Sequence, residues 1–116
     1  MNNSIRQLRE ITQVLLSPDL NYMAVRNSCT ALYDFFCSMA GFDINDPETT
    51  KHISTATGLA VGPYSAAFCI TDIMRTRNFL IGIKEAIDDR LKLKQGKPVI
   101  VMYAGTGPFA TLLSPL

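Results

Sequence analysis

The sequence predicts a mainly α-helical fold that ends in one strand and a glycine-rich turn. Apolar residues recur every three or four positions over most of residues 4–94, as on one face of a helix. An apolar run with three β-branched residues follows at 99–103 and leads into two glycines. We therefore expect about four helices in a domain at 1–96. We expect residues 97–116 to open a second domain of the parallel α/β type.

Composition limits the classes of protein that the chain can represent. It has 116 residues, of which 47% are apolar and 18% charged, and its net charge of +1 gives no basic field for nucleic acid. It has no apolar stretch of about 20 residues and no secretory leader, so we expect a cytoplasmic protein without a membrane partner. Three cysteines without CxxC spacing and a single histidine predict free thiols and no metal site.

The first two helices have clear boundaries. We expect one helix from Ser4 to Leu16, stopped by Pro18, and another from Asn21 to Ala40, closed by Gly41. The second helix carries a continuous apolar stripe, which core packing explains: Val25, Cys29, Leu32, Phe36 and Met39.

The middle of the chain predicts a loop and then further helix. Residues 42–62 are rich in Asp, Thr, Ser and Gly and are expected to form a loop with a short turn near Pro47. Pro63 suits the first position of a helix. Residues 63–94 have helical periodicity throughout, so they predict either one long helix or two helices with a break near Arg75 and Thr76.

The segment 99–113 carries the one motif with chemical meaning. An apolar strand enters the turn AGTGPFA at 104–110, and we expect a helix to begin after this turn. Glycines permit a positive φ and close approach of a ligand, and the free N–H groups of a following helix favour anions. The motif has two interpretations: the G-x-G-x-x-A form of a dinucleotide-binding fingerprint, or the first motif of a methyltransferase dependent on S-adenosylmethionine.

The residues before the turn favour the second interpretation. The segments DIMRTRNF at 72–79 and GKPV at 96–99 occur in the order and at the separation found in protein arginine methyltransferases. The chain resembles the N-terminal part of these enzymes over about residues 65–113. The resemblance implies an incomplete Rossmann-like domain, which binds S-adenosylmethionine in the complete protein, with the preceding helices as a lid over the cofactor.

The resemblance also implies cofactor-binding residues. Arg75 would pair with the methionine carboxylate of the cofactor, and Gly105, Thr106 and Gly107 would pass close to it. A local pair between Arg75 and Asp72 is the structural alternative. Val101 and Tyr103 stand where the family has an acidic residue and a glycine, so the motif is divergent.

No catalytic residue can be identified, because the acidic residues that would hold the methyl acceptor follow the first motif in this family. We therefore expect the chain to be a methyltransferase fragment, truncated after the glycine turn and inactive alone, whose acceptor is unknown. Two alternatives remain: a fragment of an NAD(P)-binding oxidoreductase, or a non-catalytic helical interaction module. We expect a homo-oligomer in any case, formed through the helices or through the exposed strand.

Overall fold

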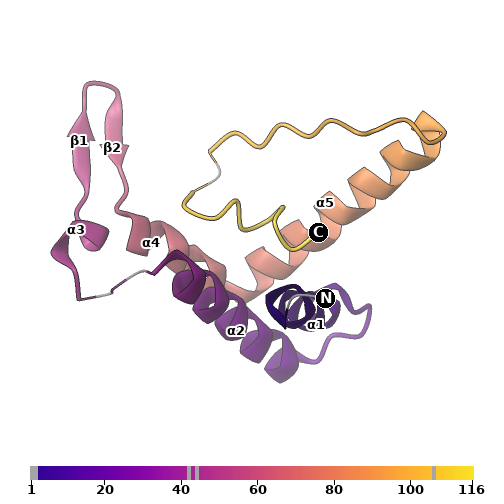
Figure 1. The fold of residues 1–116 in the computed structure, drawn as a ribbon, viewed down its shortest axis with the longest axis horizontal. Helices are drawn as coiled ribbons and strands as arrows, with labels where there is room; N and C mark the ends of the chain where they lie inside the picture. The colour runs from indigo at the N-terminus through magenta and orange to yellow at the C-terminus, as the bar shows by residue number, and fades with distance from the viewer. Residues whose placement is uncertain (1–2, 42, 44, 106) are drawn as a thin grey trace.

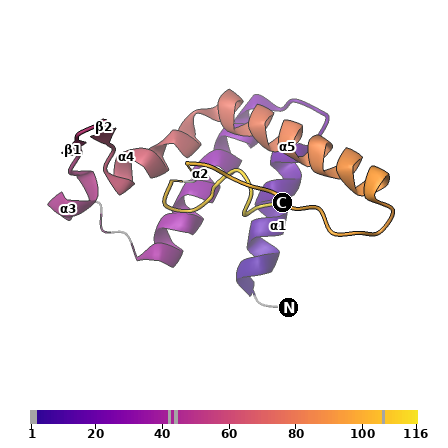
Figure 2. The ribbon, with the colours of Figure 1, turned by 90° about the horizontal axis from the view of Figure 1, so that it is seen from above.

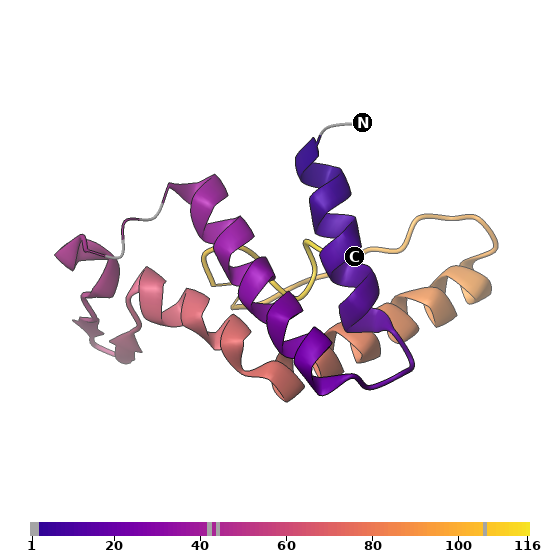
Figure 3. The same ribbon diagram turned by 90° about the horizontal axis from the view of Figure 1, so that it is seen from below.

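The computed structural model describes residues 3–41, 43, 45–105 and 107–116, and this part of the chain is mainly helical (Figure 1). Its elements follow in this order: α1 (Asn3–Leu16), α2 (Tyr22–Ala40), α3 (Pro47–Thr50), β1 (Ile53–Thr55), β2 (Gly58–Ala60), α4 (Pro63–Phe68), the 3-10 helix η1 (Cys69–Thr71) and α5 (Ile73–Lys94). Helices α1 and α2 lie side by side, and the line formed by α4 and α5 crosses them (Figures 2 and 3).

The predictions for α1 and α2 are confirmed to within one residue. Asn21 caps α2, because its side chain accepts a hydrogen bond from the backbone N–H of Ala24 at 3.1 Å. Gly41 ends this helix in the left-handed conformation, with φ +66°. Of the predicted stripe only Met39 is not covered, with 67% of its surface exposed, because the last turn of α2 extends beyond the neighbouring helices (Figure 3).

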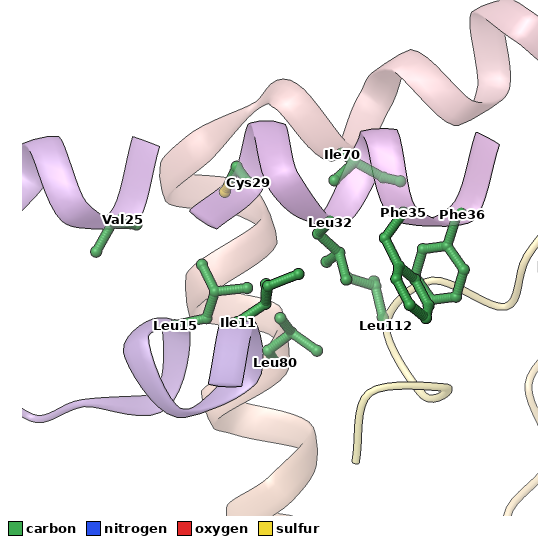
Figure 4. Packing of buried hydrophobic residues seen from close by; sticks show 10 residues of the cluster. All are labelled: Ile11, Leu15, Val25, Cys29, Leu32, Phe35, Phe36, Ile70, Leu80 and Leu112. Carbon is green, nitrogen blue, oxygen red and sulfur yellow. The ribbon is translucent and has the colours of Figure 1, made fainter. Parts of the chain in front are cut away.

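The hydrophobic core lies where three helices meet. Leu15 of α1, Leu32 of α2 and Leu80 of α5 each have 0% of their surface exposed. Figure 4 shows these side chains converging with those of neighbouring core residues, and Leu112 reaches the same core from the C-terminal segment. Helix packing therefore organises the described part of the chain, as the periodicity predicts.

A β-hairpin replaces most of the loop expected at 42–62. Strands β1 and β2 pair antiparallel, with Ile53 opposite Ala60 and Thr55 opposite Gly58. All six strand residues are exposed. The strands are only three residues long and bury no face, so the alternation that identifies a strand in a sequence is missing here. The expected turn near Pro47 is helix α3.

Residues 63–94 contain the predicted break, but it lies four residues before the expected position. Helix α4 tightens into η1, and Asp72 then caps α5 by accepting the backbone N–H of Arg75 at 3.4 Å. Thr76, near which the break was expected, is buried instead, and its hydroxyl donates a hydrogen bond to the carbonyl of Ile70 at 2.9 Å. An aspartate is as good a cap as a threonine, which explains the shift.

The C-terminal segment differs most from expectation. Residues 98–103 are extended but form no strand, and no described residue makes a backbone hydrogen bond with them. The expected helix after the glycine turn is also absent, since residues 107–115 form successive turns and Ala110 has φ +48°. A strand exists only beside a partner strand, and the two strands of the described residues pair with each other.

Truncating a core leucine should destabilise the fold strongly. We expect Leu80→Ala to lower the free energy of unfolding by about 2–5 kcal/mol, because it leaves a cavity where three helices meet. Leu93→Ala, at a position 73% exposed on the same helix, should change it by less than about 0.5 kcal/mol. Urea denaturation followed by circular dichroism measures both values, and equal effects would contradict the helix arrangement.

The turn at Ala110 gives a second prediction. A left-handed φ costs alanine roughly 1 kcal/mol and costs glycine almost nothing, so Ala110→Gly should stabilise the chain by up to that amount. Ala86→Gly, at an exposed position within α5, should instead destabilise it by about 1 kcal/mol. If both variants lose stability in urea denaturation, residue 110 is helical in solution.

Candidate cofactor site

The kink between η1 and α5 sets the position of Arg75. Asp72 caps α5 at this kink, and the buried hydroxyl of Thr76 bonds across it to the carbonyl of Ile70. Cys29 of α2 also contacts the kink, since its thiol donates a hydrogen bond to the backbone carbonyl of Ile73 with an Sγ–O distance of 4.0 Å. Arg75 therefore lies in the first turn of α5, on a backbone fixed from both sides.

The guanidinium of Arg75 keeps its charge available. It lies over the ring of Phe79, 5.5 Å from the ring centroid, in a cation–π contact on the exposed side of the helix. The Asp72 carboxylate is 3.4 Å from the backbone N–H of Arg75 and forms no ion pair with its side chain. In the part of the chain that the structure describes, no carboxylate neutralises this guanidinium.

The glycine turn adopts a backbone that needs glycine. Gly105 has φ +69° and Gly107 has φ +63°, a region that other residues enter only with strain. A Cβ atom added at either residue would have no neighbour within 4 Å, so the requirement comes from the backbone and not from crowding. Thr106, the third residue predicted in this turn, lies outside the described residues.

Aromatic and aliphatic contacts dock the C-terminal segment onto α2. The ring of Phe109 stacks on that of Phe36, with centroids 5.3 Å apart and an interplanar angle of 11°. Leu112 is 9% exposed, and Tyr103 packs partly buried against the same core. These contacts hold the glycine turn against the helices without any sheet.

The docked segment and the kink enclose a pocket of about 250 Å³. The predicted residues Arg75, Gly105 and Gly107 all line this pocket, although the arginine and the first glycine are 30 positions apart in the sequence. The other lining side chains are uncharged, and its apolar walls include Val61, Ile70 and Leu112. The arrangement offers one cation, an open backbone turn and an apolar wall to a ligand with an anionic end.

The lining residues that were not identified from the sequence include Cys69, Thr76 and Tyr103. Tyr103 was noted only because it replaces a family glycine, and the structure shows that its side chain forms part of the wall. Cys69 begins η1 and Thr76 lies near the start of α5, so the positions of both depend on the cap at Asp72 between them. The signal available for them was therefore the Asp72 cap, three residues before Arg75.

The cysteines differ in exposure and in acidity. Burial, and secondarily the Asp72 carboxylate, raises the pKa of Cys29 to about 11, and burial also raises the pKa of Cys37. Cys69 is exposed at the pocket. The described residues contain no group of three or more His, Cys, Asp or Glu side chains placed to hold a metal ion. None of their helices is both long and apolar enough to span a bilayer.

Comparisons with known proteins give no match, whether to protein-family models, to curated proteins or to solved structures. The interpretation of the site therefore depends on its geometry and on the motif.

Thiol alkylation should separate the cysteines. At pH 8 a pKa of about 11 instead of 9 makes the thiolate fraction of Cys29 roughly a hundredfold lower, and the thiolate is the reactive form. We expect iodoacetamide to label Cys69 first and Cys29 last in the folded chain, as followed by mass spectrometry of tryptic peptides. In urea the three rates should become similar. Fast labelling of Cys29 in the folded chain would contradict its burial.

Proposed function

We propose that this chain is the N-terminal, cofactor-binding part of a methyltransferase dependent on S-adenosylmethionine. The single observation that carries the proposal is the pocket shared by Arg75, Gly105 and Gly107. The family resemblance assigns these residues to one ligand, and the fold brings them together through the kink at Asp72 and the docking of Phe109.

The residues present fit one end of this cofactor. Arg75 offers two parallel N–H donors to the methionine carboxylate, and it has no competing carboxylate among the described residues. The volume of about 250 Å³ is below the roughly 300–1,000 Å³ of complete small-molecule sites. The pocket therefore suits the amino-acid end, and the adenosine requires a wall that the described residues do not form.

When bound, the cofactor would supply a methyl group carried on a sulfonium, which a nucleophilic acceptor would attack in line while S-adenosylhomocysteine leaves with the electrons of the broken carbon–sulfur bond. The residues of this chain bind and orient the cofactor. Arg75 fixes the carboxylate, Gly105 and Gly107 let the backbone approach it, and Ile70 and Leu112 exclude water from the apolar side. Positioning of this kind is the main contribution that a protein makes to a direct displacement.

The extended segment 98–103 also supports the proposal. Ile100 and Met102 are 94% and 91% exposed, and the backbone of this segment has no hydrogen-bond partner among the described residues. An apolar run with free donors and acceptors on both edges is typical of a strand from the interior of a parallel sheet. A Rossmann-like domain would supply strands on both sides of it.

A helical interaction module is the second candidate. It is favoured by the core around Leu15, Leu32 and Leu80, because these three fully buried side chains come from three helices. In this proposal the exposed run at 98–103 pairs with a second copy of the chain, so the protein is a homo-oligomer. Sedimentation velocity distinguishes this candidate, since a monomer that nonetheless binds the cofactor contradicts it.

Binding of S-adenosylhomocysteine to the 116-residue chain tests the first candidate. With only the amino-acid end held, we expect a dissociation constant of roughly 1 mM or weaker. In nuclear magnetic resonance titrations, shifts should be concentrated at Arg75, Gly105 and Gly107. Arg75→Gln should weaken binding at least about tenfold, because it removes a charge-assisted contact.

The controls use the same helix and related ligands. Arg90→Gln removes an exposed arginine from the same helix outside the pocket and should bind like the parent chain. Methylthioadenosine lacks the amino-acid end and should shift the pocket residues much less. Stronger binding of NADH than of S-adenosylhomocysteine would favour the oxidoreductase alternative. Equal binding by the Arg75 and Arg90 variants would exclude the proposed site.

A further inference from the structure

The base of the β1–β2 hairpin contains a hydrogen bond that depends on the protonation of one side chain. Gly62 comes two residues after β2, is buried, and is the N-cap residue of α4. Its backbone N–H donates to Nδ1 of His52 at 2.9 Å. Since His52 directly precedes β1, this hydrogen bond ties the two ends of the hairpin together.

The backbone is too closely packed around Gly62 to admit a side chain. A Cβ atom on Gly62 would lie 2.7 Å from the carbonyl carbon of Thr50 and 2.9 Å from the carbonyl oxygen of Lys51. The segment before β1 therefore passes directly against Gly62, the second residue after β2. The N–H of Gly62 is enclosed by this contact, and the imidazole is the acceptor that the structure gives it.

An imidazole accepts at Nδ1 only while that nitrogen carries no proton. Histidine is the side chain that ordinarily changes charge between about pH 5 and 8. We propose that His52 is a pH-sensitive latch of the hairpin: neutral, it holds Gly62 and closes the base, and protonated at Nδ1 it presents an N–H to another N–H and releases the base. The proposal is independent of the cofactor assigned to the pocket.

The other charged and titratable groups around the hairpin base are not the acceptors of the Gly62 N–H. Glu48 of α3 and Lys51 form an exposed ion pair at 3.7 Å. Asp46 caps α3 by accepting the backbone N–H of Glu48 at 2.9 Å. The strands carry no titratable side chain, and α4 carries only Tyr64. The imidazole is therefore the group of this region whose protonation acts directly on the hydrogen bond of the Gly62 N–H.

Release of the base would affect both the hairpin and the pocket. The hairpin projects from the helices as an arm (Figure 1), and all six of its strand residues are exposed. A two-stranded hairpin has little stability alone, so its orientation depends on its base. Val61 lies between β2 and Gly62 and lines the pocket with Arg75. Opening the latch at acidic pH would therefore loosen one wall of that pocket.

Amide hydrogen exchange of the ¹⁵N-labelled chain tests the latch. The exchange rate of the Gly62 amide is divided by the rate of an unstructured peptide at the same pH, which gives a protection factor. We expect this factor to fall at least about tenfold from pH 7 to pH 5, while the amide of Ala66 in α4 stays protected. His52→Asn places a side-chain oxygen near the position of Nδ1 and should keep the protection at both pH values. His52→Phe should lose it at both.

The outcomes decide the proposal. Unchanged protection of Gly62 while the imidazole resonances titrate would overturn it, as would an equal loss in the His52→Asn variant. Parallel loss at Ala66 would show unfolding of α4 instead of local release, and would also overturn it. Glu48→Gln removes the carboxylate paired with Lys51 and should reproduce the parent behaviour; a suppressed pH response would assign the switch to that carboxylate.

Discussion

The meeting of Leu15, Leu32 and Leu80 is the constraint on which the rest of the structure depends. Each leucine comes from a different helix, and none has any exposed surface. Burying three such side chains contributes several kcal/mol, at about 1.5–3 kcal/mol each. Because α5 carries one of them, the core fixes the path of α5. The kink before α5, and with it the location of Arg75, follows from that path.

The buried side chain of Arg77 is a second constraint on the helix packing, and one of its nitrogen atoms has an unfavourable environment. Arg77 is 9% exposed, and its Nη2 donates at 2.8 Å to the carbonyl of Ser17, just beyond the end of α1. The negative end of the helix dipole favours a cation there. The Nε atom of the same side chain is buried without a hydrogen-bond partner, which costs roughly 1–3 kcal/mol. Arg77 therefore fixes the register between α1 and α5 more than it adds net stability.

The sequence predicts the helical core well, because each signal there is local. Asn21 and Gly41 define the ends of α2, and four of the five stripe residues are buried. Arg75, Gly105 and Gly107, which the resemblance assigns to one ligand, line one pocket in the structure, and their role there stays a prediction. The hairpin escaped prediction because its strands bury nothing. Tyr103 and Cys69 line the pocket because segments far apart in the sequence pack together, and no local sequence pattern predicts such packing. The strand expected at 99–103 requires neighbours that the described residues do not supply.

The charge pattern of the pocket sets the direction of any amphoteric ligand. Among its lining residues Arg75 alone is charged, and residues 98–116 contain no charged side chain. A ligand with an anionic and a cationic end binds more favourably when its anionic end faces Arg75. The opposite orientation would place the cationic end of the ligand beside the guanidinium, where the two charges repel each other. For the proposed cofactor this orientation directs the carboxylate to α5 and the sulfonium away from it.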